Sequence, residues 1–232
     1  AQMAFPIPKS FPFHIAAGVF MVYGTSYHAL VQRAGINKDD EVLVLGAAGG
    51  VGLAAVDIAK SFGARVVAAV STKEKAEVCA GYGVDDVVVY GEEKLNKEGQ
   101  KAFTKELKSK SVRGGFSIIY DPIGDCFAEP ALRSIGWGGT YLVVGFAAGK
   151  IPSFPANLML LKGCAVSGVF IGRFQQEEPE QNAQNLKEIG ELLGGGKLTP
   201  FISETIPMAD SIAAIERIAE RGVVGKVVFV NN

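Results

Sequence analysis

The chain has 232 residues, of which 48% are hydrophobic and 20% are charged, and it contains 29 glycines. This composition is typical of a globular α/β protein, and it excludes a disordered chain or a repeat array. Lys and Arg total 23 against 24 Asp and Glu, so no net charge attracts the protein to nucleic acid or to an acidic membrane. Any site for an anion must therefore be formed by a local group of residues. The length suits one large domain and part of another.

The three cysteines, Cys79, Cys126 and Cys164, are far apart and form no CxxC pair. Because their number is also odd, the sequence predicts neither a disulfide framework nor a zinc site. No apolar run approaches the roughly 18 to 20 residues that span a bilayer. Pro6 and Pro8 stand where a signal peptide would have its apolar region. We therefore expect a soluble protein of the reducing cytoplasm.

The first 20 residues contain three prolines, so they are expected to form an extended connector. A helical pattern covers residues 24–34, and apolar runs alternate with amphipathic stretches from residue 41 onward. Runs such as VLVL and YLVVG lack alternation, as expected of parallel strands that helices cover on both faces. Strands are expected at residues 41–45, 65–70, 86–89, 116–121, 140–145 and 164–170, and helices at 50–62, 73–82, 97–109, 128–135 and 179–193.

This rhythm predicts an α/β fold, a Rossmann-type doubly wound parallel sheet with helices on both faces. After three glycines at 194–196, the pattern becomes strand (201–206), helix (209–221) and strand (226–230). This tail either extends the sheet or belongs to a second domain whose other strands are absent, and the proline-rich start favours the second interpretation. We expect three parts: a connector (1–20), a nucleotide-binding domain (21–198) and a segment of a substrate domain (199–232).

The strongest chemical signal is the loop GAAGGVG at 46–52, between the strand VLVL and a helix that begins LAAVDIA. Small residues let the backbone approach a pyrophosphate, while the helix N-terminus offers free N–H groups and a partial positive charge. Ala47 takes the first glycine position of the GxGxxG pattern, and Gly49 and Gly52 take the other two. Gly52 would allow close packing of the helix on the strand. The loop predicts dinucleotide binding.

The end of the second strand indicates which dinucleotide binds. In this kind of fold an acidic residue about 20 positions beyond the loop binds the ribose 2′-hydroxyl of NAD. Here the strand ends in Val70-Ser71-Thr72 without a carboxylate, and Lys73 and Lys75 follow in the first turn of a helix, where anions are favoured. The pattern favours NADPH over NADH. The alternative is that both lysines are ordinary solvated surface side chains.

Seven motifs, spread in order along nearly the whole chain, fit the pattern of one protein family. They are YGTSYHAL (23–30), GAAGGVGLAA (46–55), STKEK (71–75), YDPIGD (120–125), GGTYLVVGFAAG (138–149), NLMLLK (157–162) and GKVV (225–228). The chain thus resembles the NADPH-dependent, zeta-crystallin-like quinone oxidoreductases of the medium-chain dehydrogenase/reductase superfamily. The resemblance implies zinc-independent hydride transfer from NADPH to a quinone or enone. It also implies that most of an N-terminal GroES-like domain, which shapes the substrate pocket in that family, is absent from this sequence.

The resemblance assigns roles to particular residues of the cofactor site. It places the pyrophosphate on Ala48, Gly49, Gly50 and Val51, and the 2′-phosphate on Ser71 and Lys75. It places the adenosine phosphate beside Tyr90, with the basic residue Arg221 near the same end of the cofactor. It places the nicotinamide pocket at Thr25, Phe146 and Phe170. Tyr90 could instead be a surface aromatic residue, Arg221 a helix cap, and the two phenylalanines core residues. We identify no catalytic acid.

Several other patterns are set aside. His14 and His28 have no nearby cysteine, so they do not indicate a metal site. Tyr90 and Lys94 have the YxxxK spacing of short-chain dehydrogenases, but the segment follows a strand and contains Gly91, and we interpret it as coincidence. Two alternatives stay open: an enoyl reductase of the same superfamily, or a non-catalytic module that holds cofactor. We expect a homodimer through the edge strand at 164–170.

Overall fold

The structure, a computed structural model, describes residues 7, 11–219 and 223–231. Six strands form a parallel sheet in the order β3-β2-β1-β4-β5-β6, which is the doubly wound Rossmann order. The strands are β1 Glu41–Leu45, β2 Arg65–Val70, β3 Asp86–Val89, β4 Phe116–Asp121, β5 Ile135–Val143 and β6 Ala165–Gly168. The predicted fold class is confirmed.

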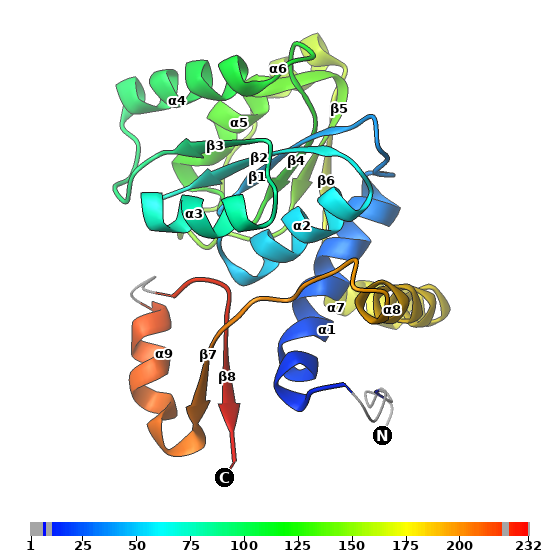
Figure 1. Ribbon diagram of the computed structural model, residues 1–232. Coiled ribbons are helices and arrows are strands. Elements are labelled where there is room, and N and C mark those ends of the chain that lie inside the picture. The colour runs from blue at the N-terminus through cyan, green and yellow to red at the C-terminus, as the bar shows by residue number, and fades with distance from the viewer. Residues whose placement is uncertain (1–6, 8–10, 220–222, 232) are drawn as a thin grey trace.

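Helices cover both faces of this sheet (Figure 1). Along β1, Val42 and Val44 pack in the core on one face, whereas Leu43 and Leu45 pack in the core on the other. Because both faces are buried, the strand is apolar at successive positions. The helices α2 Gly50–Ser61 and α3 Lys73–Gly81 cover the first face, and α4 Lys97–Lys110 and α5 Ala128–Ser134 cover the second.

The first helix, α1 Phe13–Tyr27, begins much earlier than the predicted start at residue 24, and it continues into a π-helix, His28–Arg33. The extended conformation expected for residues 1–20 is therefore wrong for 13–20. Pro12 is extended and directly precedes the helix, a place where proline is tolerated, so the prolines mark a helix start here. No helix in the described ranges is both long and apolar enough to cross a membrane.

Three more helices follow β5 along the chain. The helices α6 Ala156–Lys162 and α7 Ile171–Glu177 were not predicted, whereas α8 Pro179–Gly194 agrees with its prediction. The β6 strand is shorter than the expected 164–170 because the chain turns into α7 directly after Phe170. Short helices of two turns carry little periodicity, which is why the sequence did not reveal them.

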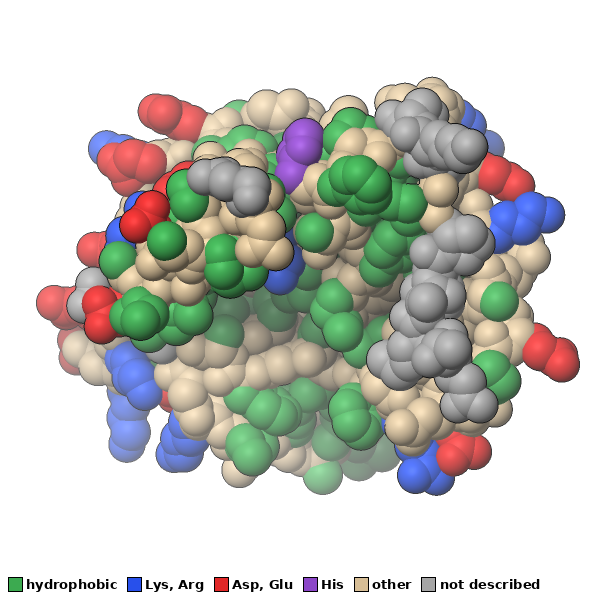
Figure 2. All heavy atoms as spheres, turned by 90° about the horizontal axis from the view of Figure 1, so that it is seen from below, with side chains coloured by type: hydrophobic (Ala, Val, Ile, Leu, Met, Phe, Trp, Pro, Cys, Tyr) green, Lys and Arg blue, Asp and Glu red, His purple; other side chains and the backbone are tan. Residues whose placement is uncertain are grey.

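The tail forms its own sheet below the main one (Figure 1). Strands β7 Ile202–Pro207 and β8 Lys226–Val230 pair in parallel, and α9 Ser211–Ala219 connects them. The tail therefore does not extend the six-stranded sheet, although its assignment to a separate domain stays a prediction. Hydrophobic side chains gather on the lower face of the molecule (Figure 2). Phe13 of α1 and Ile212 of α9 are among the exposed ones.

One buried carboxylate joins the tail to helices α1 and α2. The Oδ2 atom of Asp57, in α2, accepts a hydrogen bond from the Tyr23 hydroxyl at 2.6 Å and another from the Thr199 N–H at 2.7 Å. Tyr82 donates a hydrogen bond to the Thr199 carbonyl at 2.5 Å. Burial raises the pKa of Asp57 above its usual value, against the effect of these hydrogen bonds. Helices α1 and α2 and the start of the tail thus meet at one side chain.

Candidate nucleotide-binding site

The glycine-rich loop makes a tight turn from β1 into α2. Gly46 has a left-handed backbone with φ of 57°, which glycine adopts without steric cost. The N–H of Gly49 donates to the Gly46 carbonyl at 3.0 Å and closes the turn. Gly49 is the extended residue that precedes α2. The first N–H groups of a helix have no partner within it, so this turn presents a site for an anion.

Gly52 packs against the backbone of this turn. A Cβ atom at Gly52 would lie 2.3 Å from the Gly46 carbonyl oxygen and 2.8 Å from the Ala47 Cα, so only glycine allows this approach. At Gly50 a Cβ atom would lie 3.4 Å from the Gly225 carbonyl oxygen. Gly225 also donates its N–H to the Ala48 carbonyl at 2.8 Å and forms a parallel bridge with Gly49. The tail therefore supports the loop directly.

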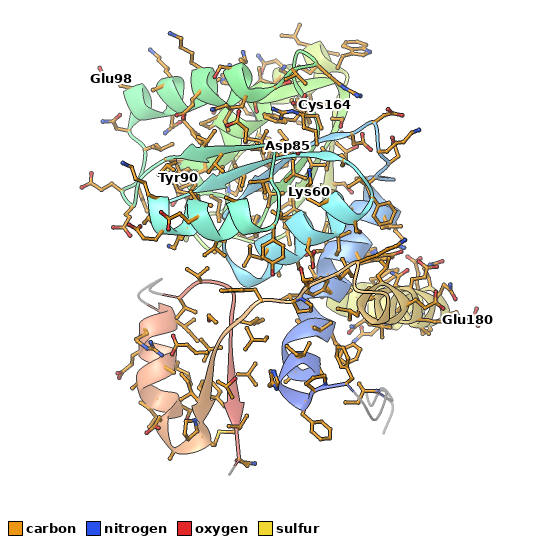
Figure 3. All side chains as sticks on the ribbon, viewed as in Figure 1. Lys60, Asp85, Tyr90, Glu98, Cys164 and Glu180 are labelled. Carbon is orange, nitrogen blue, oxygen red and sulfur yellow. The ribbon has the colours of Figure 1, made fainter. Side chains whose placement is uncertain are left out.

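A cleft of about 440 Å³ opens beside this turn, where the parallel strands end. Five of the residues predicted for the cofactor line it together: Ala48, Gly49, Ser71, Lys75 and Tyr90. The lining further includes Gly46, Val70, Gly91, Glu92, Glu93, Lys94, Ile123, Phe127, Ala147, Ala148 and Val223. Ligands of doubly wound folds bind at the carboxyl ends of the strands, and Figure 3 shows Tyr90 at one end of β3 and Asp85 at the other.

The wall of the cleft at the end of β2 combines a hydroxyl and an ammonium group. Lys75 Nζ donates to Ser71 Oγ at 2.9 Å, and Thr72 caps α3 by accepting from the Lys75 N–H at 3.3 Å. The three residues at the end of this strand, Val70-Ser71-Thr72, include no acidic side chain. A cation beside a hydroxyl donor at a helix N-terminus matches the requirements of a phosphate monoester.

An aromatic group forms the neighbouring wall. The Tyr90 ring lies 4.6 Å from that of Phe127 and 5.7 Å from that of Phe103, measured between centroids. Tyr90 and Lys94 are in the loop after β3 and not on a helix, so they are not a helical YxxxK pair. No sequence signal places Ile123 or Val223 in this wall, because the turn after β4 and the tail reach the cleft only through tertiary packing.

The turn after β4 is fixed by Asp121. Its carboxylate accepts hydrogen bonds from the N–H groups of Ile123 and Gly124, both at 2.8 Å, and from the Tyr141 hydroxyl at 2.6 Å. Burial raises the pKa of Asp121, and the hydrogen bonds oppose this change. Because Oδ1 accepts both hydrogen bonds from the turn and Oδ2 is bound to Tyr141 of β5, Asp121 holds Ile123 in the wall of the cleft.

The other predicted residues that the structure describes are not in the lining of the cleft. Thr25 is buried and donates to the Met21 carbonyl at 2.7 Å, and Val51 accepts from the Ser26 hydroxyl at 2.9 Å through its carbonyl. The side chains of Phe146 and Phe170 are 40% and 73% exposed, so core packing does not explain them. Arg221 lies outside the described residues. The nicotinamide roles of Thr25, Phe146 and Phe170 stay predictions.

Neither histidine forms part of a metal centre in the described part of the chain, where no group of three His, Cys, Asp or Glu side chains could hold an ion. His28 stacks on Phe174 with ring centroids 3.8 Å apart. Burial is the largest cause that lowers the pKa of His28. His28 is therefore a packed side chain.

The doubly wound sheet and its glycine-rich turn define a dinucleotide-binding fold. The sequence profile of the zinc-binding dehydrogenases matches residues 50–188, and the chain belongs to that family. Over 225 residues it is 34% identical to a quinone oxidoreductase-like protein 2 homolog of Nematostella vectensis, a match that covers 96% of this chain and 59% of the relative. The chain thus spans less than two thirds of that relative.

Two solved structures extend the comparison. A mycobacterial protein complexed with NADPH is similar with a TM-score of 0.88 at 25% identity, over 99% of this chain and 68% of that one. The quinone oxidoreductase of Thermus thermophilus, also solved with NADPH, has a TM-score of 0.79 at 28% identity, over 97% of this chain and 69% of that one. These relatives confirm the resemblance predicted from the motifs.

Proposed function

We propose that this chain binds NADPH in the cleft and forms the nucleotide-binding part of an oxidoreductase that reduces a quinone or an enone. The observation that carries the proposal is the shared lining of the cleft by the loop residues Ala48 and Gly49 and by the paired Ser71 and Lys75. The relatives solved with NADPH support the same cofactor. NADPH supplies the hydride when bound, and the chain binds and orients it.

Different residues of the cleft bind different parts of the cofactor. The turn at 46–49 and the N-terminus of α2 take the pyrophosphate, because their N–H groups and small side chains permit close approach. Ser71 and Lys75 take the 2′-phosphate. Gly52 keeps α2 against the turn and so fixes where the pyrophosphate lies. Orientation of this kind, rather than a covalent step, is what the described residues contribute to hydride transfer.

Substrate binding is proposed for the whole protein and not for this chain alone. The quinone oxidoreductase-like relative is longer than this chain, and we propose that its additional part corresponds to a substrate domain that covers the exposed apolar face around α1 and α9. We also propose a zinc-independent reaction, because the chain is similar to quinone oxidoreductases, and a location in the cytoplasm, since the described cysteines are free. An enoyl reductase is the alternative enzyme, and reduction of enoyl thioesters in preference to quinones by the whole protein would favour it.

Calorimetric titration with NADPH and NADH tests the cofactor. We expect Lys75→Ala to weaken NADPH binding about tenfold while NADH binding is unchanged, because a charge-assisted contact to the 2′-phosphate is lost. Lys60→Ala is the matched control, since Lys60 pairs with Asp85 at the opposite end of β3. Failure of the unmodified chain to bind either nucleotide would contradict the proposal, as would equal weakening of both by Lys75→Ala.

We further propose that the chain forms a homodimer through β6. This strand is last in the sheet order, so one side of it has no neighbouring strand in the described sheet, and the strand of a second copy offers the matching geometry. Sedimentation should give twice the chain mass of 24.4 kDa. Val166→Pro should shift the protein to monomer, because proline removes an N–H from the edge; a monomeric unmodified chain would refute the dimer.

A further inference from the structure

Two loops meet at the end of the cleft where Tyr90 lies. One follows β3 and contains Lys94, and the other follows β4 and contains Asp125. Lys94 Nζ lies 2.6 Å from Asp125 Oδ2, and the Leu95 N–H donates to Cys126 Sγ at 3.3 Å. Lys94 itself lines the cleft. An ion pair and a backbone hydrogen bond therefore tie one loop to the other beside the cofactor site.

The conformation of Asp125 is unusual. With φ of 54°, it is the one non-glycine residue in the described ranges that has a positive φ, a conformation that is costly for most side chains. Its N–H donates to the Lys150 carbonyl at 3.0 Å, and its side chain is only 8% exposed. The surroundings thus hold this carboxylate in place, where it can fix the position of a mobile partner such as a lysine.

Lys94 is the accessible partner of the pair. Its side chain is 65% exposed, whereas that of Asp125 is 8% exposed. Water around the ammonium group screens the pair, so its contribution to folding stability is small. The pair does not join elements of the core. Its effect is on the loop that precedes α4, which contributes residues 91–94 to the cleft next to Ser71 and Lys75.

We propose that the Lys94–Asp125 pair holds the loop 91–94 across the adenosine end of the cleft, which makes Lys94 a positioning residue for the adenosine half of NADPH. This inference rests on the proposed binding of NADPH in the cleft. The position of Tyr90 at the start of the loop, and of Phe127 just after Asp125, means that the pair also fixes the separation of two aromatic side chains in the cleft wall.

Titration of Lys94→Met and Asp125→Asn with NADPH and with adenosine 2′,5′-bisphosphate tests the proposal. Asn is suited to position 125, because it tolerates positive φ better than most residues while it lacks the charge. Each variant, and the double variant, is expected to bind both ligands roughly fivefold more weakly than the unmodified chain, since all three lose the same pair. The melting temperature is expected to stay unchanged.

Lys110→Met is the matched control. Lys110 pairs with Asp86 at 2.8 Å and so braces the same strand and helix, β3 and α4, at the end away from the cleft. It should leave both affinities unchanged. Weaker binding by Lys94→Met alone would instead mean a direct phosphate contact and would overturn the proposal, as would unchanged affinity in both variants. If the unmodified chain did not bind NADPH, the proposed function itself would be refuted. This result differs from the two outcomes that refute only the role of the Lys94–Asp125 pair.

Discussion

Replacement of Gly52 by alanine is expected to abolish measurable NADPH binding. The added Cβ would lie 2.3 Å from the Gly46 carbonyl oxygen and 2.8 Å from the Ala47 Cα. Both are backbone atoms, which cannot rotate away, so α2 must shift from the turn. A displacement of about 1 Å at a binding site costs on the order of a hundredfold in function, and overpacking of this kind destabilises by about 1–3 kcal/mol.

Titration with NADPH and thermal unfolding measure the two effects. Gly190→Ala is the matched control, because Gly190 lies within α8 and a Cβ atom there meets nothing within 4 Å. In an open helical position the same substitution should stabilise by about 1 kcal/mol and leave binding intact. If Gly52→Ala bound NADPH as well as Gly190→Ala does, the close contact between α2 and the turn would not determine where the pyrophosphate binds.

Gly225→Ala is expected to have the second largest effect. Gly225 has φ of 67°, and a Cβ atom there would lie 2.4 Å from Cδ1 of Phe201. The Phe201 ring can move partly aside, so the expected loss of affinity is smaller than at Gly52. The expected loss of stability is about 2–3 kcal/mol, because strain of the left-handed backbone adds to the overpacking. Because the Gly225 N–H donates to the Ala48 carbonyl, the NADPH affinity should also fall, by about tenfold.

The control for Gly225→Ala is Gly196→Ala. Gly196 has a similar φ of 68°, but a Cβ atom there meets nothing within 4 Å. It should therefore lose only about 1–2 kcal/mol from the left-handed backbone and none of the affinity. The difference between the two variants, measured by urea unfolding and by titration, isolates the contact of the tail with the loop. Equal losses in both variants would show that this contact contributes nothing.

The sequence predicted the central strands β1, β2 and β4 well because they are buried on both faces, whereas β5 spans Ile135–Val143 and not the expected 140–145. The bounds of β1, β2, β3 and β4 agree with the expected ranges, since continuous apolar runs between glycine-rich turns leave little ambiguity. The start of α1 was missed for a specific reason. Prolines at 6, 8 and 12 indicate extended chain locally, but a proline just before Phe13 is equally compatible with the start of a helix.

Five of the residues predicted for the cofactor line one cleft, and their binding roles stay predictions. Gly49, Ser71 and Tyr90 each end or follow a strand, and parallel strands bring their carboxyl ends to one edge. Lys94 and Asp125 could not be paired in this way, because their contact depends on how two loops of irregular conformation fold back. The separation of 31 residues between them carries no periodic signal.

The position of Asp57 bears on how the molecule fluctuates in its native state. If the tail detached from α2, Asp57 Oδ2 would lose the hydrogen bond from Thr199 and keep only the one from Tyr23. Loss of a donor to a buried carboxylate costs about 1–3 kcal/mol, which disfavours separate opening of the tail. Regions that open together form a foldon, and by this reasoning the tail shares one with α1 and α2, although more than 140 residues separate Asp57 from Thr199.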